Sequence, residues 1–134
     1  MNSQPRILIV DDEGAIRGLL TAAFSMAGYH VRTAAVASEA MRLCADEPFD
    51  IVLSDVVMPE MDGHELARWI ANRHPHIRTV LMSGFDSGCH ECPLAGRCML
   101  LPKPFRPSEA VSVVARALAD PPATPPSTLR NSTA

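Results

Sequence analysis

The sequence predicts an open, doubly wound α/β fold, in which a five-stranded parallel sheet carries helices on both faces. Three observations support this prediction. Short apolar runs alternate with segments of helical periodicity along the chain. The apolar runs are continuous, which is typical of parallel strands buried on both faces. The chain has 134 residues, 47% of them hydrophobic, and a net charge of −3, so it is large enough for one buried core.

The first two strands and their helices follow from local patterns. The apolar run 6–10 is too short for a helix and predicts the first strand. One face of a helix follows, formed by Ile16, Leu19, Leu20, Ala23 and Phe24. Gly28 ends this helix, and the alternating segment 29–33 predicts a strand near an edge. Ser38 is expected to cap a second helix, which runs to Asp46.

Three further apolar runs predict the remaining strands, at residues 50–54, 77–82 and 99–101. Between the first two of these runs, a helix begins at His64 and is stopped by Pro75. The last helix opens at Pro107, because proline is well suited to the first helical turn.

Two segments do not fit a regular element. Glycines and a proline interrupt residues 83–98, so a fourth helix in this region is expected to be short or irregular. From residue 120 the chain reads PPATPPSTLRNSTA, which predicts a disordered, proline-rich tail. The expected organisation is therefore one ordered domain over residues 1–119 and a tail over 120–134.

Polar residues follow the strands at their carboxyl ends. Asp11 and Asp12 follow the first strand, Asp55 the third, Ser83 the fourth and Lys103 the fifth. The usual order for five such strands is the flavodoxin-like order 2-1-3-4-5, which reverses between strands one and three. Because ligands bind outside the carboxyl edge at this reversal, we expect these side chains to form one site.

The residue types in this set suit phosphoryl chemistry. Carboxylates that share one edge repel one another unless a cation intervenes, and ligands that are all oxygen favour Mg²⁺. A carboxylate can also act as a nucleophile and form an acyl phosphate. Lys103, the single lysine among 12 basic residues, would neutralise the phosphoryl charge, and the Ser83 hydroxyl would donate to it. Each feature alone has an ordinary explanation as a cap, turn or surface loop, and it is their order that carries the inference.

These motifs resemble the receiver domain of two-component response regulators. The resemblance is carried by Ile7-Leu-Ile-Val-Asp-Asp-Glu13, Asp55-Val-Val-Met-Pro-Glu-Met-Asp-Gly63, Met82-Ser-Gly84 and Lys103-Pro-Phe105. It implies a cytoplasmic signalling domain, not an enzyme beyond its own autocatalytic phosphotransfer and self-dephosphorylation. The phosphate donor would be a sensor histidine kinase or a phosphotransfer protein, and the downstream protein target stays unknown. The charge and hydropathy predict neither a direct nucleic-acid partner nor a membrane span.

The resemblance assigns the metal site and the phosphoacceptor. Asp55 would accept the phosphoryl group. Asp12, Asp55 and the backbone carbonyl of Val57 would ligate Mg²⁺ directly, and Asp11 would hold the ion through water.

The resemblance also assigns the groups around the phosphate. Ser83 would be the switch hydroxyl, and Lys103 would contact the phosphate through a cis Lys103–Pro104 segment. Val57 and Phe85 match two positions that tune hydrolysis, and their apolar side chains are expected to hinder the attacking water. Leu100 stands where the family usually has an aromatic switch residue, so we expect output through backbone and loop shifts.

Two alternatives use other residues. Cys89, His90, Cys92 and Cys98 could form a metal- or redox-sensing cluster, although a second Cys-x2-Cys pair is missing and free thiols also fit the pattern. A phosphatase acting on small molecules would need a second acid two residues after Asp55, where Val57 stands.

Overall fold

The computed structural model describes residues 4–83 and 99–119. Strands and helices alternate along these residues: β1 (Arg6–Val10), α1 (Gly14–Met26), β2 (His30–Ala34), α2 (Ala37–Asp46), β3 (Ile51–Asp55), α3 (Gly63–Arg73), β4 (Arg78–Ser83), β5 (Met99–Pro102) and α4 (Pro107–Ala119). The expected irregular fourth helix, the cysteine cluster, Phe85 and the tail all lie outside the described residues.

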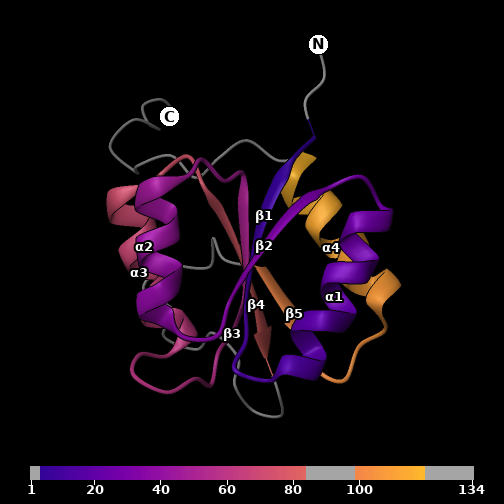
Figure 1. Cartoon of the computed structure of the whole chain (residues 1–134), viewed down its shortest axis with the longest axis horizontal. Helices are drawn as coiled ribbons and strands as arrows, with labels where there is room; N and C mark the ends of the chain where they lie inside the picture. Colours follow the sequence, from indigo (N-terminus) through magenta and orange to yellow (C-terminus); the bar gives the residue numbers. More distant parts are fainter. Residues whose placement is uncertain (1–3, 84–98, 120–134) are drawn as a thin grey trace, which may run out of the picture.

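The five strands form one parallel sheet in the order β2-β1-β3-β4-β5, which confirms the predicted fold class and strand order. Figure 1 shows α1 and α4 on one face of the sheet and α2 and α3 on the other. The reversal of strand order therefore falls between β1 and β3, as expected. In the described part of the chain, no helix has both the length and the apolar character needed to cross a bilayer.

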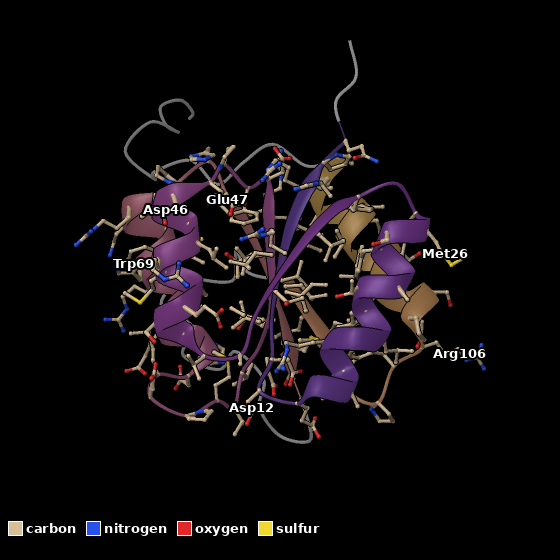
Figure 2. The ribbon with its side chains drawn as sticks, viewed as in Figure 1. Asp12, Met26, Asp46, Glu47, Trp69 and Arg106 are labelled. Atoms are coloured by element: carbon tan, nitrogen blue, oxygen red, sulfur yellow. The ribbon has the colours of Figure 1, made fainter. Side chains whose placement is uncertain are left out.

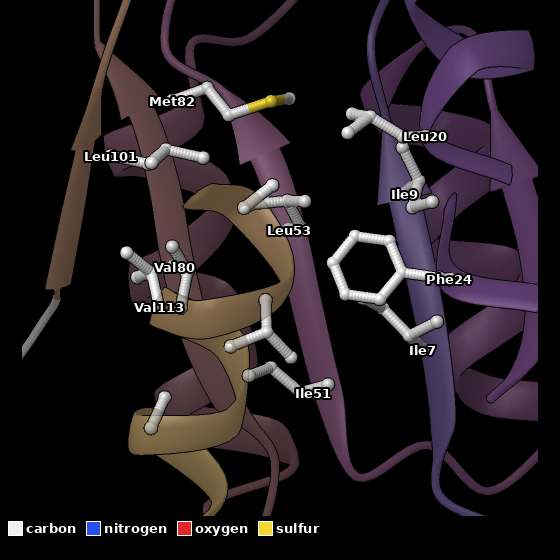
Figure 3. Close-up of a cluster of buried hydrophobic side chains, with 13 residues drawn as sticks. Ile7, Ile9, Leu20, Phe24, Ile51, Leu53, Val80, Met82, Leu101 and Val113 are labelled. Atoms are coloured by element: carbon white, nitrogen blue, oxygen red, sulfur yellow. The ribbon is translucent and has the colours of Figure 1, made fainter. Parts of the chain in front are cut away.

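Each face of the sheet has its own core. Ile7 and Ile9 of β1 point into the core beneath α1 and α4, whereas Leu8 and Val10 point into the core beneath α2 and α3. Figure 3 shows Phe24 of α1 packed among the strand residues of the first core. Because both faces are covered, the strands β1 and β3 are buried along nearly their whole length, and their sequences show no alternation. The edge strand β2 alternates between exposed and half-buried residues over most of its length, as the sequence predicts.

One residue of α1 that the sequence places on the buried face of the helix is exposed in the structure. Leu19 was expected in the core, but 48% of its surface is exposed. The contact stripe of α1 is centred on Leu20 and Phe24, which are both fully buried, so Leu19 lies at its edge. Met26 lies further along the outward side and is 88% exposed (Figure 2).

The start of α2 also differs from the prediction, because Ser38 does not cap it. The helix begins at Ala37, and its N-cap is Val36, whose side chain cannot accept a hydrogen bond. Glutamates satisfy the nearby backbone donors in its place. The Ser38 N–H donates to Glu60 Oε1 at 3.3 Å, and the Ala35 N–H donates to Glu39 Oε1 at 3.0 Å.

Helix α3 begins with a complete capping box, which follows the loop between β3 and α3. Asp62 accepts a hydrogen bond from the Glu65 N–H at 2.9 Å, and Glu65 Oε1 accepts one from the Asp62 N–H at 3.1 Å. This reciprocal capping box satisfies two backbone donors at once. It begins α3 at Gly63, one residue before the predicted start.

We expect Asp62→Ala to lower the free energy of unfolding by about 1 kcal/mol, since it removes the N-cap acceptor of α3. Urea unfolding followed by circular dichroism measures this loss. Asp62→Asn keeps an acceptor of equal quality and should stay close to the wild type. An equal loss in both variants would show that the charge of Asp62, and not its capping bond, stabilises the helix.

Candidate functional site

The carboxyl edge of the sheet gathers the predicted polar residues. Asp55 and Ser83 are the last residues of β3 and β4, which are neighbouring strands. Asp11 follows β1, and Lys103 follows β5. Figure 2 shows Asp12 at this end of the molecule, and Asp46 toward the opposite end. The register of the parallel strands therefore brings residues from four separate segments to one rim.

Three carboxylates meet at this rim. Asp11, Asp12 and Asp55 each offer an oxygen, and these atoms all lie within 4.8 Å of one another. Asp11 is fully buried and Asp55 is 6% exposed, whereas Asp12 is open to solvent. The cluster is thus buried at Asp11 and Asp55 and accessible to solvent at Asp12.

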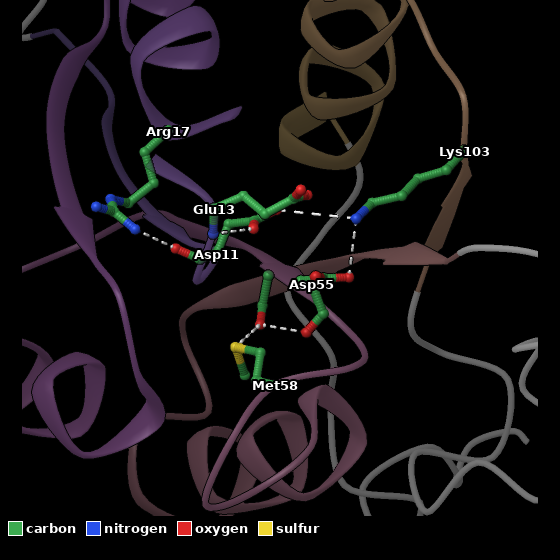
Figure 4. Close-up of polar contacts among 7 residues, drawn as sticks. Asp11, Glu13, Arg17, Asp55, Met58 and Lys103 are labelled. Atoms are coloured by element: carbon green, nitrogen blue, oxygen red, sulfur yellow. Dashed lines mark hydrogen bonds and ion pairs between the residues drawn. The ribbon is translucent and has the colours of Figure 1, made fainter. Parts of the chain in front are cut away.

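Lys103 is the cation that faces this cluster (Figure 4). Its Nζ lies 3.2 Å from Asp55 Oδ1 and 3.9 Å from Asp11 Oδ2. The Lys103 N–H donates to the Ser83 carbonyl at 2.7 Å, which fixes the start of the lysine loop beside β4. The Lys103–Pro104 peptide bond is cis, as the resemblance implied.

The two carboxylate oxygens of Asp11 have different surroundings. Its Oδ1 accepts a hydrogen bond from the Glu13 N–H at 2.8 Å. Its Oδ2 is buried and has no hydrogen-bond donor among the residues that the structure describes. Arg17 is turned elsewhere and donates to the backbone carbonyl of Asp11 at 2.7 Å. Asp11 Oδ2 is therefore a buried carboxylate oxygen that lies 3.9 Å from Lys103 Nζ, and no described residue donates a hydrogen bond to it.

The electrostatics of the site follow from this arrangement. Burial raises the pKa of Asp11 above its ordinary value of 3.8, and the negative charge of Asp55 raises it further. The Glu13 N–H and the Lys103 ammonium act in the opposite direction but do not cancel the rise in this pKa. Among the residues that the structure describes, a single ammonium faces three carboxylates, which leaves this part of the site with excess negative charge. Oxygen donors of this kind fit a hard divalent cation.

Other predicted residues lie around the rim. Ser83 is buried at the end of β4, and Leu100 is half-buried on β5. Val57 is 70% exposed, on the loop that follows β3. The Cys89, His90, Cys92 and Cys98 alternative falls outside the described residues, so the geometry bears only on the aspartate site.

Sequence reasoning missed Ser54, the residue before Asp55. Its buried hydroxyl donates to the Asp55 carbonyl at 2.9 Å and lies 3.9 Å from Met58 Sδ. The available signal was a single serine inside an otherwise apolar strand. Because a buried hydroxyl needs a hydrogen-bond partner, such a serine indicates a hydrogen bond to a nearby backbone group.

The fold and this rim define a class of protein, and comparison with known families gives the same class. The family model described as "Response regulator receiver domain" matches residues 7–115. The chain belongs to this family, and is therefore a receiver domain of two-component signal transduction.

Relatives in sequence carry this domain in different contexts. The DNA-binding transcriptional regulator NtrC of Azospirillum brasilense is 41% identical over 118 residues, which cover 87% of this chain and 24% of that protein. The sensor kinase CckA of Brucella abortus is 36% identical over 118 residues, covering 85% of this chain and 12% of that protein. The response regulator receiver protein CpdR of the same organism is 40% identical over 80 residues, covering 60% of this chain and 67% of that protein. The chain thus spans a minor part of the first two relatives.

Solved structures share the fold along nearly their whole length. The chemotaxis response regulator CheY4 of Vibrio cholerae superimposes with a TM-score of 0.79 at 28% identity, covering 86% of this chain and 99% of that one. The response regulator TrrA of Thermotoga maritima, solved in complex with Mg²⁺ and BeF, gives a TM-score of 0.78 at 27% identity, covering 85% and 99% of the two chains.

We expect Asp11→Asn to be more stable than the wild type at neutral pH without divalent ions. Because the folded-state pKa of Asp11 is raised, the folded protein holds this proton more tightly than the unfolded chain. The stability contribution of this proton is fully present below 3.8 and is lost as pH rises through the folded-state pKa. Urea unfolding of the wild type and Asp11→Asn in the presence of a chelator, from neutral pH down to 3.8, measures the difference in their free energies of unfolding.

The stability advantage of Asp11→Asn should disappear as the pH falls toward 3.8, where the wild-type carboxyl is protonated. An advantage that stays constant with pH, or a variant that is less stable at neutral pH, would contradict this account of the Asp11 charge.

Proposed function

We propose that this receiver domain is phosphorylated on Asp55 with Mg²⁺, and that phosphorylation switches a protein-interaction surface. The observation that carries the proposal is the position of the Asp55 carboxylate, which is nearly buried between Lys103 and the Asp11–Asp12 pair. The phosphoryl donor would be a histidine kinase or a phosphotransfer protein. The sensor kinase CckA and the regulator NtrC, which both contain a similar segment, support a place in such a relay.

The donor set supports Mg²⁺ as the cofactor. Asp12, Asp55 and the Val57 carbonyl would ligate the ion, and Asp11 would hold it through water. When bound, Mg²⁺ would neutralise the charge of the carboxylates and of the incoming phosphoryl group. The buried Asp11 Oδ2, to which no described residue donates a hydrogen bond, supports this assignment, and so does the excess negative charge of the described rim residues. The response regulator TrrA, which is 27% identical to this chain, was solved in complex with Mg²⁺.

The proposed reaction transfers a phosphoryl group between two side chains. An Asp55 carboxylate oxygen attacks the phosphorus of a phosphohistidine, the P–N bond breaks as the P–O bond forms, and the imidazole leaves. Lys103 would balance the charge on the phosphoryl oxygens, since its ammonium already lies 3.2 Å from Asp55. The Ser83 hydroxyl would donate to one of these oxygens from the neighbouring strand end.

The output of the domain would come from the loops at the same rim. Phosphorylation adds charge beside Lys103 and Ser83 and would bias these loops between two arrangements. Leu100 offers no aromatic ring to follow this change. The exposed, apolar Val57 would give the attacking water no hydrogen bond, which favours slow self-dephosphorylation.

Incubation with acetyl phosphate and Mg²⁺ tests the proposed function directly. We expect the wild type to gain one acid-stable, base-labile phosphoryl group by intact-protein mass spectrometry, and Asp55→Asn to gain none. Asp46→Asn is the matched control, because Asp46 is exposed at the end of α2, and it should be labelled like the wild type. Equal labelling of Asp55→Asn and the wild type would reject Asp55 as the acceptor.

Lys103→Ala separates phosphate binding from metal binding. Removing the ammonium should lower the rate of labelling, because the phosphoryl charge loses its counterion. The same change should tighten Mg²⁺ binding by about fivefold, since it removes a positive charge that competes with the ion. Isothermal titration measures the Mg²⁺ affinity. Parallel losses in both quantities would indicate that the variant damages the site as a whole.

A further inference from the structure

Gly63, the first residue of α3, lies directly against the backbone of the proposed phosphoacceptor. A Cβ at this position would overlap the Asp55 carbonyl oxygen and would lie 2.9 Å from the Val56 Cα. Both neighbours are backbone atoms, which cannot rotate away as a side chain can. Gly18 on α1 is the contrast, because a Cβ there would meet nothing within 4 Å among the described residues.

The same stretch of backbone is held from other sides. The Gly63 N–H donates to the Val56 carbonyl at 2.8 Å, and the Val56 N–H donates to the Met82 carbonyl at 3.1 Å. The buried Ser54 hydroxyl donates to the Asp55 carbonyl at 2.9 Å. The peptide units at the end of β3 are therefore fixed by α3, by β4 and by the strand's own serine.

This arrangement controls two groups of the site. The Val56–Gly63 hydrogen bond closes the loop 57–62, whose first residue carries the proposed carbonyl ligand. The Asp55 carbonyl belongs to the residue whose carboxylate lies 3.2 Å from Lys103. Pushing this carbonyl aside would turn the carboxylate and shift the loop together. Because Mg²⁺ requires near-ideal octahedral geometry, a small displacement of its ligands weakens its binding.

We propose that Gly63 is a positioning residue of the phosphoacceptor site, whose missing side chain lets α3 set the backbone of Asp55. The inference rests on the proposed function of Asp55. The competing explanation is structural, and states that Gly63 only allows α3 to pack. The two explanations predict different effects of adding a side chain at Gly63. If Gly63 only allows packing, the substitution lowers stability alone. If Gly63 positions Asp55, the substitution lowers Mg²⁺ affinity in a protein that still folds.

Gly63→Ala in the full chain tests the proposal. We expect its Mg²⁺ affinity, measured by isothermal titration, to fall by about tenfold or more, as is common when support of a metal ligand is lost. The rate of labelling by acetyl phosphate should fall with it. Gly18→Ala is the matched control and should keep the wild-type Mg²⁺ affinity within about twofold, as exposed substitutions usually do.

Asp62→Ala provides the structural reference. It weakens the start of the same helix without adding an atom near Asp55, so its Mg²⁺ affinity should stay within about twofold of the wild type. A folded Gly63→Ala protein with unchanged Mg²⁺ affinity would overturn the proposal. An Mg²⁺ affinity that falls equally in Asp62→Ala would also overturn it, since that result points to packing.

Ser54→Ala decides the question if Gly63→Ala does not fold. It releases the same carbonyl without adding bulk, and we expect a loss of Mg²⁺ affinity of about threefold or more, the size of one hydrogen bond. Unchanged affinity in Ser54→Ala would then reject the proposal. If the wild type neither binds Mg²⁺ nor accepts phosphate, both this inference and the proposed function are rejected. An active wild type beside an unaffected Gly63→Ala rejects this inference alone.

Discussion

Repulsion between carboxylates at one edge of the sheet is the constraint on which the rest of the site depends. The parallel register aligns the ends of β1 and β3, so the backbones of Asp11 and Asp55 cannot move apart without disrupting strand pairing, and Asp12 follows Asp11 directly. Two of these side chains are buried, where charge is poorly solvated. Lys103 offsets part of this unfavourable energy from the end of β5. The remaining negative charge is what would draw a cation and a phosphoryl group to the rim.

The two apolar cores make this concentration of charge tolerable. Leu8 and Ile9 are fully buried on opposite faces of the strand that leads to Asp11, and the neighbouring strand β3 is buried along its whole length. Burial of apolar surface contributes roughly 25 cal/mol per Å². Both faces of the sheet therefore supply favourable energy close to the rim. The strands form a rigid base, and the carboxylates are held by that base even though they repel one another.

The sequence predicts the frame better than the details at its ends. The strands were predicted from continuous apolar runs, and their order from the usual arrangement of five parallel strands. The meeting of Asp11, Asp12 and Asp55 was predicted from polar residues placed directly after strands, since parallel pairing leaves little freedom there. Ser38 and Leu19 were placed wrongly because tertiary neighbours decided both cases. A distant carboxylate from Glu60 reaches the start of α2, and the contact stripe of α1 is narrower than its apolar face. Such contacts join residues far apart in the chain and leave no local pattern.

Gly63 illustrates a different limit of sequence reasoning. A glycine at the start of a helix is usually explained by the turn before it, and nothing in the local pattern reveals that its Cα faces the Asp55 carbonyl. The capping box of Asp62 and Glu65 begins α3 at Gly63, but the close approach to β3 depends on the missing Cβ of Gly63 and on its hydrogen bond to the Val56 carbonyl. The geometry of the acceptor would thus depend on the first residue of a helix that contributes no charge to the site, and not on how strongly that helix is capped.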